Sequence, residues 1–248
     1  MPNARRRTES HRRGTSAVAW TVAGALCIAL AGCSTTVDGI PKASAPGTPS
    51  PPRTTAVGPI LPAQLPDLLT PSSSLSVTQG SPLFERDMQA SLFAGADPAH
   101  CLGATAYGTY PLFPHDYTGR EARTQEDTVQ NQHQLLEVSA TYPSNFDAAG
   151  FLATVRKTVS DCQIPVTAWG DDNKKLTVAP GPLLPTVPDV VHWTTKIIGD
   201  QWICDFSVIA KANVVSQLVT CSPDRSIDNE ALVTKRLVKI DELLHSTS

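Results

Sequence analysis

The clearest chemical signal in this chain is a cysteine that follows two small residues, in the sequence Leu30-Ala31-Gly32-Cys33. The pattern is typical of a bacterial lipobox, in which a signal peptidase cuts before the cysteine and the thiol receives a diacylglyceryl group. Such a cut requires small neighbouring side chains, which Ala31 and Gly32 provide. We therefore predict that Cys33 is lipidated and becomes the first residue of the mature chain.

The residues before Cys33 have the composition of a signal peptide, which we place at residues 1–32. Five arginines between Arg5 and Arg13 form a basic segment, and an uncharged apolar run follows from Ala17 to Ala31. This run has the length of a signal-peptide core and is short for a membrane span; the alternative is an uncleaved signal anchor. Since two acyl chains anchor a protein stably, we expect attachment to the outer face of the cytoplasmic membrane.

Elsewhere the sequence offers little for catalysis or for a cofactor. It contains no nucleophile elbow, P-loop, glycine-rich dinucleotide loop or H-E-x-x-H motif. None of the histidines after Cys33 has a metal-ligand neighbour at a suitable spacing; they are His100, His115, His133, His192 and His245. Asp171-Asp172 and Asp200 are candidates for holding a cation, although solvated turn residues are the simpler interpretation. We predict no enzyme activity, no metal and no cofactor.

Charge argues against nucleic acid as a partner. The whole chain has 20 Lys and Arg, 23 Asp and Glu, and a net charge of −3. Removal of residues 1–32 takes away five Arg and one Glu, which leaves 15 basic and 22 acidic residues and a net charge of −7. An acidic surface repels phosphate backbones, so a nucleic-acid-binding function is not expected.

Four cysteines remain once Cys27 leaves with the signal peptide and Cys33 is lipidated: Cys101, Cys162, Cys204 and Cys221. In an exported domain this number predicts two disulfides, for which three connectivities exist. A zinc site is the alternative, but zinc sites contain close pairs such as C-x₂-C, and this chain has none.

The mature chain divides into a tether over residues 33–60 and one domain over residues 61–248. The tether is rich in Pro, Ser, Thr, Gly and Ala and has almost no large apolar residues. Such a segment cannot bury enough surface to offset its chain entropy, so we expect it to hold the domain away from the bilayer. A proline-rich ligand for another protein is the alternative, but the segment lacks a P-x-x-P core with basic flanks.

The domain is expected to combine helices and strands. Apolar residues at helical spacing predict helices over 65–69, from Asp97-Pro98 to Gly108, from Asn145 to Cys162, and over 226–244. Strands are predicted over 75–79, 134–142 (half-buried), 166–169, 176–178, 190–198, 201–210 and 214–220, with a proline-rich loop over 180–188. The polar segment 120–127 is expected as an exposed strand. This order favours a single α+β domain with an antiparallel sheet flanked by helices.

The last two predicted strands suggest a disulfide pairing. If they turn at Ala212-Asn213, facing residues have numbers that sum to 425, as Cys204 and Cys221 do. Facing Cα atoms in a non-hydrogen-bonded pair are roughly 4.5 Å apart, near the short end of the disulfide range. We therefore predict the Cys204–Cys221 bridge and, by elimination, Cys101–Cys162.

Candidates for ligand binding come from the same strands. Trp169, Trp193 and Trp202 are large apolar residues that could line a cleft, with core packing as the alternative. Asp205 and Gln201 are expected on the strand face opposite Trp202 and are candidate polar residues of a cleft. We take Trp169, Trp193, Gln201 and Asp205 as the candidate ligand-binding residues.

Three segments together resemble a known signature: Trp202-Ile203-Cys204, Asn213-Val214-Val215, and Cys221. This combination resembles the extracellular sensor domain of the mycobacterial serine/threonine kinase PknH and its lipoprotein relatives, over about residues 61–244. The resemblance implies an α+β sandwich-like domain with a twisted antiparallel sheet, two disulfides and a broad cleft for a ligand. One departure is that the family usually has paired asparagines at the turn, where this chain has Ala212-Asn213.

These observations favour a membrane-tethered lipoprotein of the cell envelope whose domain binds a small-molecule or cell-wall ligand without catalysis. A scaffold that presents its surface to other envelope proteins is the main alternative. A cell-wall hydrolase is a third hypothesis, but the sequence shows no acid–base pair or activated nucleophile for it.

Overall fold

A computed structural model describes residues 57–72, 74–75, 82–86, 93–110, 112–127 and 132–246. The predicted signal peptide, Cys33 and most of the predicted tether lie outside these residues, as does most of the strand expected over 75–79. Within the described ranges, none of the helices has both the length and the apolar character needed to span a membrane.

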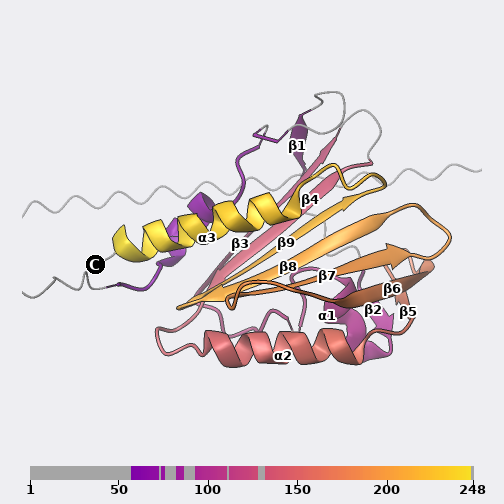
Figure 1. Ribbon diagram of the computed structural model, residues 1–248, viewed down its shortest axis with the longest axis horizontal. Coiled ribbons are helices and arrows are strands. Elements are labelled where there is room, and N and C mark those ends of the chain that lie inside the picture. The colour runs from indigo at the N-terminus through magenta and orange to yellow at the C-terminus, as the bar shows by residue number, and fades with distance from the viewer. Residues whose placement is uncertain are drawn as a thin grey trace, which may run out of the picture. The chain divides into compact units, whose positions relative to one another are not determined.

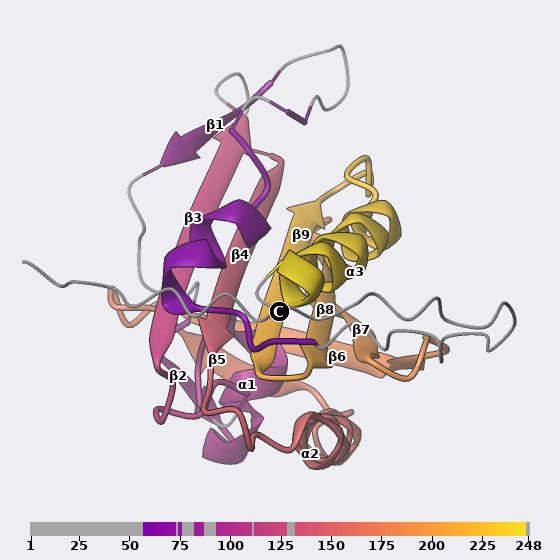
Figure 2. The same cartoon turned by 90° about the vertical axis from the view of Figure 1, so that its left-hand side faces the viewer.

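The described residues form one antiparallel sheet of nine strands, in the order β1-β3-β4-β9-β8-β7-β6-β5-β2 (Figure 1). The strands are β1 (Leu83–Arg86), β2 (Gly95–Asp97), β3 (Gly119–Asp127), β4 (Gln134–Thr141), β5 (Val166–Trp169), β6 (Lys175–Leu184), β7 (Val190–Ile197), β8 (Ile203–Lys211) and β9 (Val214–Ser222). The predicted α+β class is confirmed. Figure 2 shows that strand direction rotates markedly from β3 and β4 to β6 and β5, as in a twisted sheet.

Helices cover both faces of the sheet. The helix α2 (Ala148–Asp161) packs on one face, beside η3 (Ala99–Cys101) and α1 (Leu102–Thr105). The helix α3 (Asn229–Ser246) and the 3₁₀ helix η1 (Pro62–Leu68) pack on the other face (Figures 1 and 2). The central strand β8 contacts both α2 and α3, so it has a buried core on each side.

The strand β4 is buried on both faces, so the expectation of a half-buried strand was wrong. Leu136 and Val138 belong to the core under α2, whereas Leu135 belongs to the core under α3. The polar residues Glu137 and Ser139 alternate with Leu136 and Val138 along the strand, and they are fully buried as well. Their polar side chains were expected to face solvent, but they accept hydrogen bonds from Arg236 of α3.

The neighbouring strand β3 was expected to be exposed, but its residues Thr124, Gln125 and Asp127 are buried.

The register predicted for the last hairpin is confirmed. Ile203 faces Ser222 and Cys204 faces Cys221, so the numbers of facing residues sum to 425. Cys204 and Cys221 form a disulfide with a Cα–Cα distance of 4.1 Å. The second predicted disulfide, Cys101–Cys162, is also present and links the end of η3 to the end of α2.

The turn of this hairpin also holds the beginning of the domain. Ala212 has a φ of 51°, the left-handed conformation that a two-residue hairpin turn requires. The Asn213 side chain accepts a hydrogen bond from the Ile60 backbone N–H at 2.9 Å and donates to the Ile60 carbonyl at 2.9 Å. It also donates to the Tyr142 carbonyl at 3.2 Å. One side chain therefore joins three segments that are far apart in the sequence.

Two predicted helix starts were displaced. Asp97 does not cap a helix: it is the last residue of β2 and pairs with Thr167, and the helical segment begins only at Ala99. Asp97 therefore pairs with the neighbouring strand β5 and does not cap the helical segment. The next helix is capped by Asp147, whose Oδ1 accepts from the Gly150 backbone N–H at 2.9 Å, and not by Asn145.

The region expected as a proline-rich loop is partly strand. The strand β6 continues through Pro180 and Pro182 to Leu184, with a register shift between Pro180 and Leu183. A proline lacks the N–H that a regular ladder needs but fits at an irregularity of this kind. Two smaller differences concern the predicted helices. The first of them is a 3₁₀ helix, η1, and the last, α3, begins at Asn229 and not at Ser226.

Candidate ligand sites on the two faces of the sheet

The structure separates the four residues proposed for ligand binding. Trp193 is fully buried, stacks on Phe206 with ring centroids 5.1 Å apart, and donates from Nε1 to the Ala104 carbonyl at 2.9 Å. It is a core residue, as the alternative interpretation expected. Trp169 is half-buried on β5 and packs so closely on Gly95 that a Cβ there would lie 2.4 Å from the indole.

The two polar candidates also lie apart. Gln201 is exposed in the turn before β8, where its backbone N–H donates to the Asp200 carboxylate at 2.6 Å. Asp205 is buried on the α3 side of β8. The four residues therefore do not form one site. Among the hollows of the described residues, two adjoin residues that the sequence analysis named: one lies beside Trp202 and the other, on the opposite face of the sheet, beside Asp205.

An apolar hollow of about 300 Å³ lies on the face of the sheet that carries α1 and α2. Its apolar walls are Phe93, Leu176, Val178, Ile197 and Trp202, and Cys204 of the hairpin disulfide adjoins them. Its polar lining consists of Thr105, Gln134, Thr195 and Asp200. A predominantly apolar wall with a few polar groups is the usual composition of a small-molecule site, and this volume is at the lower end of the usual range.

One polar group in this apolar hollow lacks a partner. The Gln134 side-chain oxygen is buried and has no hydrogen-bond partner among the described residues. The Gln134 Nε2 donates to Glu126 Oε1 at 3.1 Å. Because a carboxylate only accepts, this contact fixes which end of the amide carries the oxygen. The free oxygen can therefore accept a hydrogen bond from a ligand that has an N–H or O–H group.

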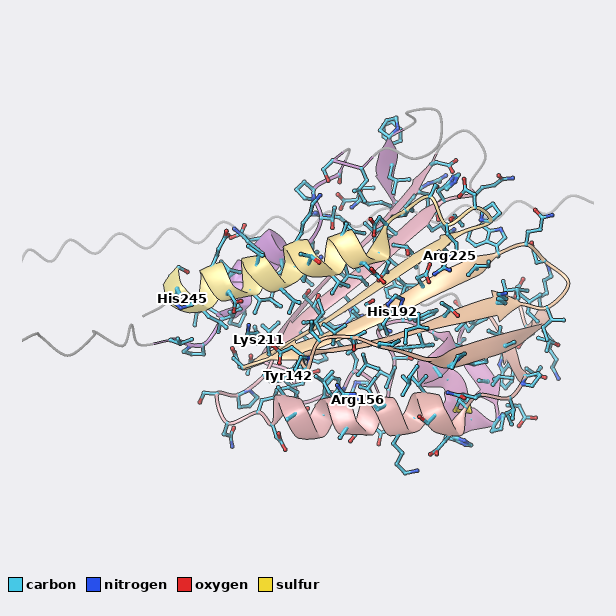
Figure 3. All side chains as sticks on the ribbon, viewed as in Figure 1. Tyr142, Arg156, His192, Lys211, Arg225 and His245 are labelled. Carbon is cyan, nitrogen blue, oxygen red and sulfur yellow. A yellow bond between two sulfur atoms is a disulfide. The ribbon has the colours of Figure 1, made fainter. Side chains whose placement is uncertain are left out.

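A polar hollow of about 410 Å³ lies on the α3 face, near the beginning of that helix. It is lined by Leu184, His192, Asp205, Arg225, Ile227, Asp228, Asn229 and Glu230. Figure 3 shows His192 and Arg225 near the N-terminal end of α3. Asn229 is already occupied: its amide contacts Ser207, the Asp205 carbonyl and Thr220.

Asp205 is the centre of the charged group in the polar hollow. The Arg225 guanidinium donates from Nε to Asp205 Oδ2 at 3.0 Å and from Nη2 to Asp205 Oδ1. The His192 Nε2 lies 3.7 Å from the same Oδ1. Burial by itself would raise the pKa of Asp205, but His192 and Arg225 outweigh it and lower that pKa below its ordinary value. Asp205 therefore remains ionised.

Two other histidines have acidic or cysteine neighbours that are already engaged. His133 lies between two carboxylates, with Nδ1 2.5 Å from Asp127 Oδ2 and Nε2 3.2 Å from Asp224 Oδ1, so both ring nitrogens are engaged. His100 lies close to Cys101 and Cys162, but those sulfurs are bonded to each other. A metal ligand needs the thiolate, which the disulfide removes.

Sequence reasoning had no signal for most of either hollow. Phe93, Gln134 and Leu176 come from three separate segments, and Arg225 lies in an irregular loop. For His192, surface or capping roles were preferred to metal binding, and a place in a hollow was not considered. One weak signal did exist: consecutive residues of a strand point to opposite faces, which predicted that Asp205 and Cys204 lie on different faces of the sheet.

Comparison with known proteins supports the family suggested by the cysteine and asparagine signature. The family model of the PknH-like extracellular domain matches residues 60–239. The crystal structure of the extracellular domain of PknH from Mycobacterium tuberculosis is similar in fold, with a TM-score of 0.61 and 19% sequence identity. The match covers 76% of this chain and 98% of that chain. No curated protein shows significant sequence similarity. Because the family model covers most of the chain, this protein belongs to the family of PknH-like extracellular domains.

Proposed function

We propose that this protein is a lipid-anchored lipoprotein of the cell envelope whose extracytoplasmic domain binds a small amphipathic ligand in the apolar hollow, without catalysis. The observation that carries the proposal is the unpartnered Gln134 oxygen in a predominantly apolar hollow. Membership in a family of extracellular domains supports the extracytoplasmic location, and the two disulfides suit an oxidising compartment.

The lining restricts the class of ligand. The side chains of Trp202 and Ile197 favour an apolar or aromatic body, and the Gln134 oxygen favours a hydrogen-bond donor at one end. Asp200 is the charged residue of the lining, and Glu126 adjoins Gln134. Both carboxylates repel an anion, so we expect a neutral or cationic ligand that carries a hydroxyl or amine group.

Native mass spectrometry of protein purified from its own envelope tests the proposal. We expect the wild-type protein to retain a small molecule, and Ile197→Gln to lose it because a polar side chain then replaces part of the apolar wall. Ile198→Gln is the matched control, since Ile198 is the adjacent residue, is 56% exposed and does not line the hollow. Retention by Ile197→Gln equal to that of the control contradicts the assignment. A consistently empty hollow with copurifying proteins would favour the scaffold hypothesis.

The lipid anchor has its own test. Replacement of Cys33 by alanine removes the thiol that accepts the diacylglyceryl group, so the protein should leave the membrane fraction or accumulate as an uncut precursor. The measurement is fractionation followed by intact-mass analysis. A processed Cys33→Ala protein that stays in the membrane fraction would show that something else anchors the chain.

A further inference from the structure

His192 has a buried ring nitrogen whose polar neighbour, Asp205 Oδ1, lies beyond hydrogen-bond distance. The residue is 6% exposed, and its Nε2 has no hydrogen-bond partner in the described part of the chain. The loss of water from such an atom is unfavourable unless another group replaces it. The contrast with His133 is direct, because both ring nitrogens of that histidine are engaged. His192 lines the polar hollow, so a group bound there lies beside this ring.

The distance between His192 and Asp205 fits a bridging donor. The 3.7 Å from His192 Nε2 to Asp205 Oδ1 is too long for a direct hydrogen bond. It is short enough for one ligand nitrogen to lie about 2.8 Å from both atoms. Contact with an ammonium group requires the His192 tautomer that carries its hydrogen on Nδ1, because Nε2 is then an acceptor, and an ionised carboxylate only accepts. The pair therefore fits a ligand atom that carries at least two hydrogens.

The charge of the polar hollow favours a cationic donor. Asp205, Asp228 and Glu230 contribute three carboxylates to its lining, against the single guanidinium of Arg225. That guanidinium is already paired with Asp205 through two hydrogen bonds. An anion would meet net negative charge, whereas a cation is attracted.

From these three observations we propose that the polar hollow is a second binding site, which takes the protonated primary amine of a small ligand. The ammonium group has three N–H donors, of which one points to His192 Nε2 and one to Asp205. The remaining volume of this hollow, about 410 Å³ in total, accepts a polar body attached to the amine. The site is separate from the apolar hollow because the two lie on opposite faces of the sheet.

Titration of the whole protein with ethanolamine, followed by NMR of the histidine ring nitrogens, tests this inference. We expect saturable shifts of the His192 resonances with a millimolar Kd, and no such shifts with N-acetylethanolamine or inorganic phosphate. His192→Phe should weaken ethanolamine binding at least tenfold, measured by the shifts of nearby backbone amides.

A milder pair of variants covers the case in which His192→Phe does not fold. Glu230 is exposed in the first turn of α3, and Glu230→Gln should weaken binding two- to threefold by removing one negative charge from the hollow. Glu242→Gln makes the same chemical change near the other end of α3 and should leave the Kd unchanged. No saturable shift at His192 up to about 100 mM ethanolamine, an equal response to N-acetylethanolamine or phosphate, or equal Kd values for these two variants would overturn the proposal.

Discussion

Cys204 and Asp205 are consecutive residues of β8, and their side chains line hollows on opposite faces of the sheet. Cys204 adjoins the apolar hollow and is bonded to Cys221, whereas Asp205 lies in the polar hollow and is paired with Arg225. These two hollows therefore lie on opposite faces of the same strand. The disulfide and the ion pair both link β8 to β9 or to the segment after it, so the same hairpin supports both sites.

Two neighbouring substitutions in the β8–β9 turn should differ clearly in their effect on stability. Asn213→Ala leaves the N–H and C=O of buried Ile60 without partners and should lower the free energy of unfolding by about 2–3 kcal/mol. Ala212→Gly should leave stability unchanged or raise it by up to about 1 kcal/mol, because glycine adopts the positive φ without strain. Urea unfolding of both variants measures this, and a larger loss from Ala212→Gly than from Asn213→Ala would contradict the account.

Replacement of only one partner of the buried Arg236–Glu137 pair should destabilise the fold strongly. Arg236 Nη2 donates to Glu137 Oε1 beneath α3, and the two residues are 3% and 0% exposed. Arg236→Met leaves a buried carboxylate without its cation and should cost about 3–5 kcal/mol of unfolding free energy. Addition of Glu137→Gln should recover part of that loss, because a neutral amide is cheaper to bury.

Lys235→Met is the control for this pair, since Lys235 is the preceding residue of α3 and is exposed. Its effect should stay within about 0.5 kcal/mol. If Arg236→Met and Lys235→Met changed the urea midpoint equally, the buried pair would not contribute as described.

Asp205 should contribute to stability in a way that depends on pH. Its pKa in the folded protein lies below the ordinary value of 3.8 because His192 and Arg225 outweigh the effect of burial. At pH values above the ordinary pKa the carboxylate is ionised, and its stabilising contribution is fully present. This contribution is lost as the pH falls through the folded-state pKa. The difference in unfolding free energy between the wild type and Asp205→Asn should shrink between pH 7 and pH 3.

Other carboxylates titrate over the same interval, so the comparison needs a matched variant. Asp171→Asn changes an exposed turn residue and should show a difference from the wild type that stays small at every pH. A difference for Asp205→Asn that remained constant from pH 7 to pH 3 would be inconsistent with the lowered pKa.

The two disulfides should differ in the stability they provide. They close loops with sequence separations of 61 and 17 residues. In the chain-entropy model, removal of Cys101–Cys162 costs about 4 kcal/mol and removal of Cys204–Cys221 about 3 kcal/mol. Denaturation of the paired Cys→Ser variants without reductant measures both values. A larger loss for the shorter loop would show that packing beside Cys204, and not loop entropy, dominates there.

Local patterns were sufficient where neighbouring residues decide the structure. The alternation in β8 and β9 and the short turn at Ala212-Asn213 predicted the register, and therefore the Cys204–Cys221 pairing. The apolar spacing before Cys162 predicted the helix α2, although its cap was placed two residues early. In each case the interacting residues are close in sequence, so a pattern over a few residues contains the information.

Tertiary structure decided what depends on residues far apart in the chain. Glu137 looked like a solvent-facing residue of β4, and its burial follows from a partner on α3 that is 99 residues away. Gln134 and His192 acquire their unpartnered atoms only after other elements have excluded water from them. Burial, charge balance and cavity shape are properties of the packed sheet and helices, and no local window of sequence contains them. Local sequence patterns predicted the β8–β9 hairpin, the disulfide pairing and the family, whereas packing on both faces of the sheet decided the positions of the hollows.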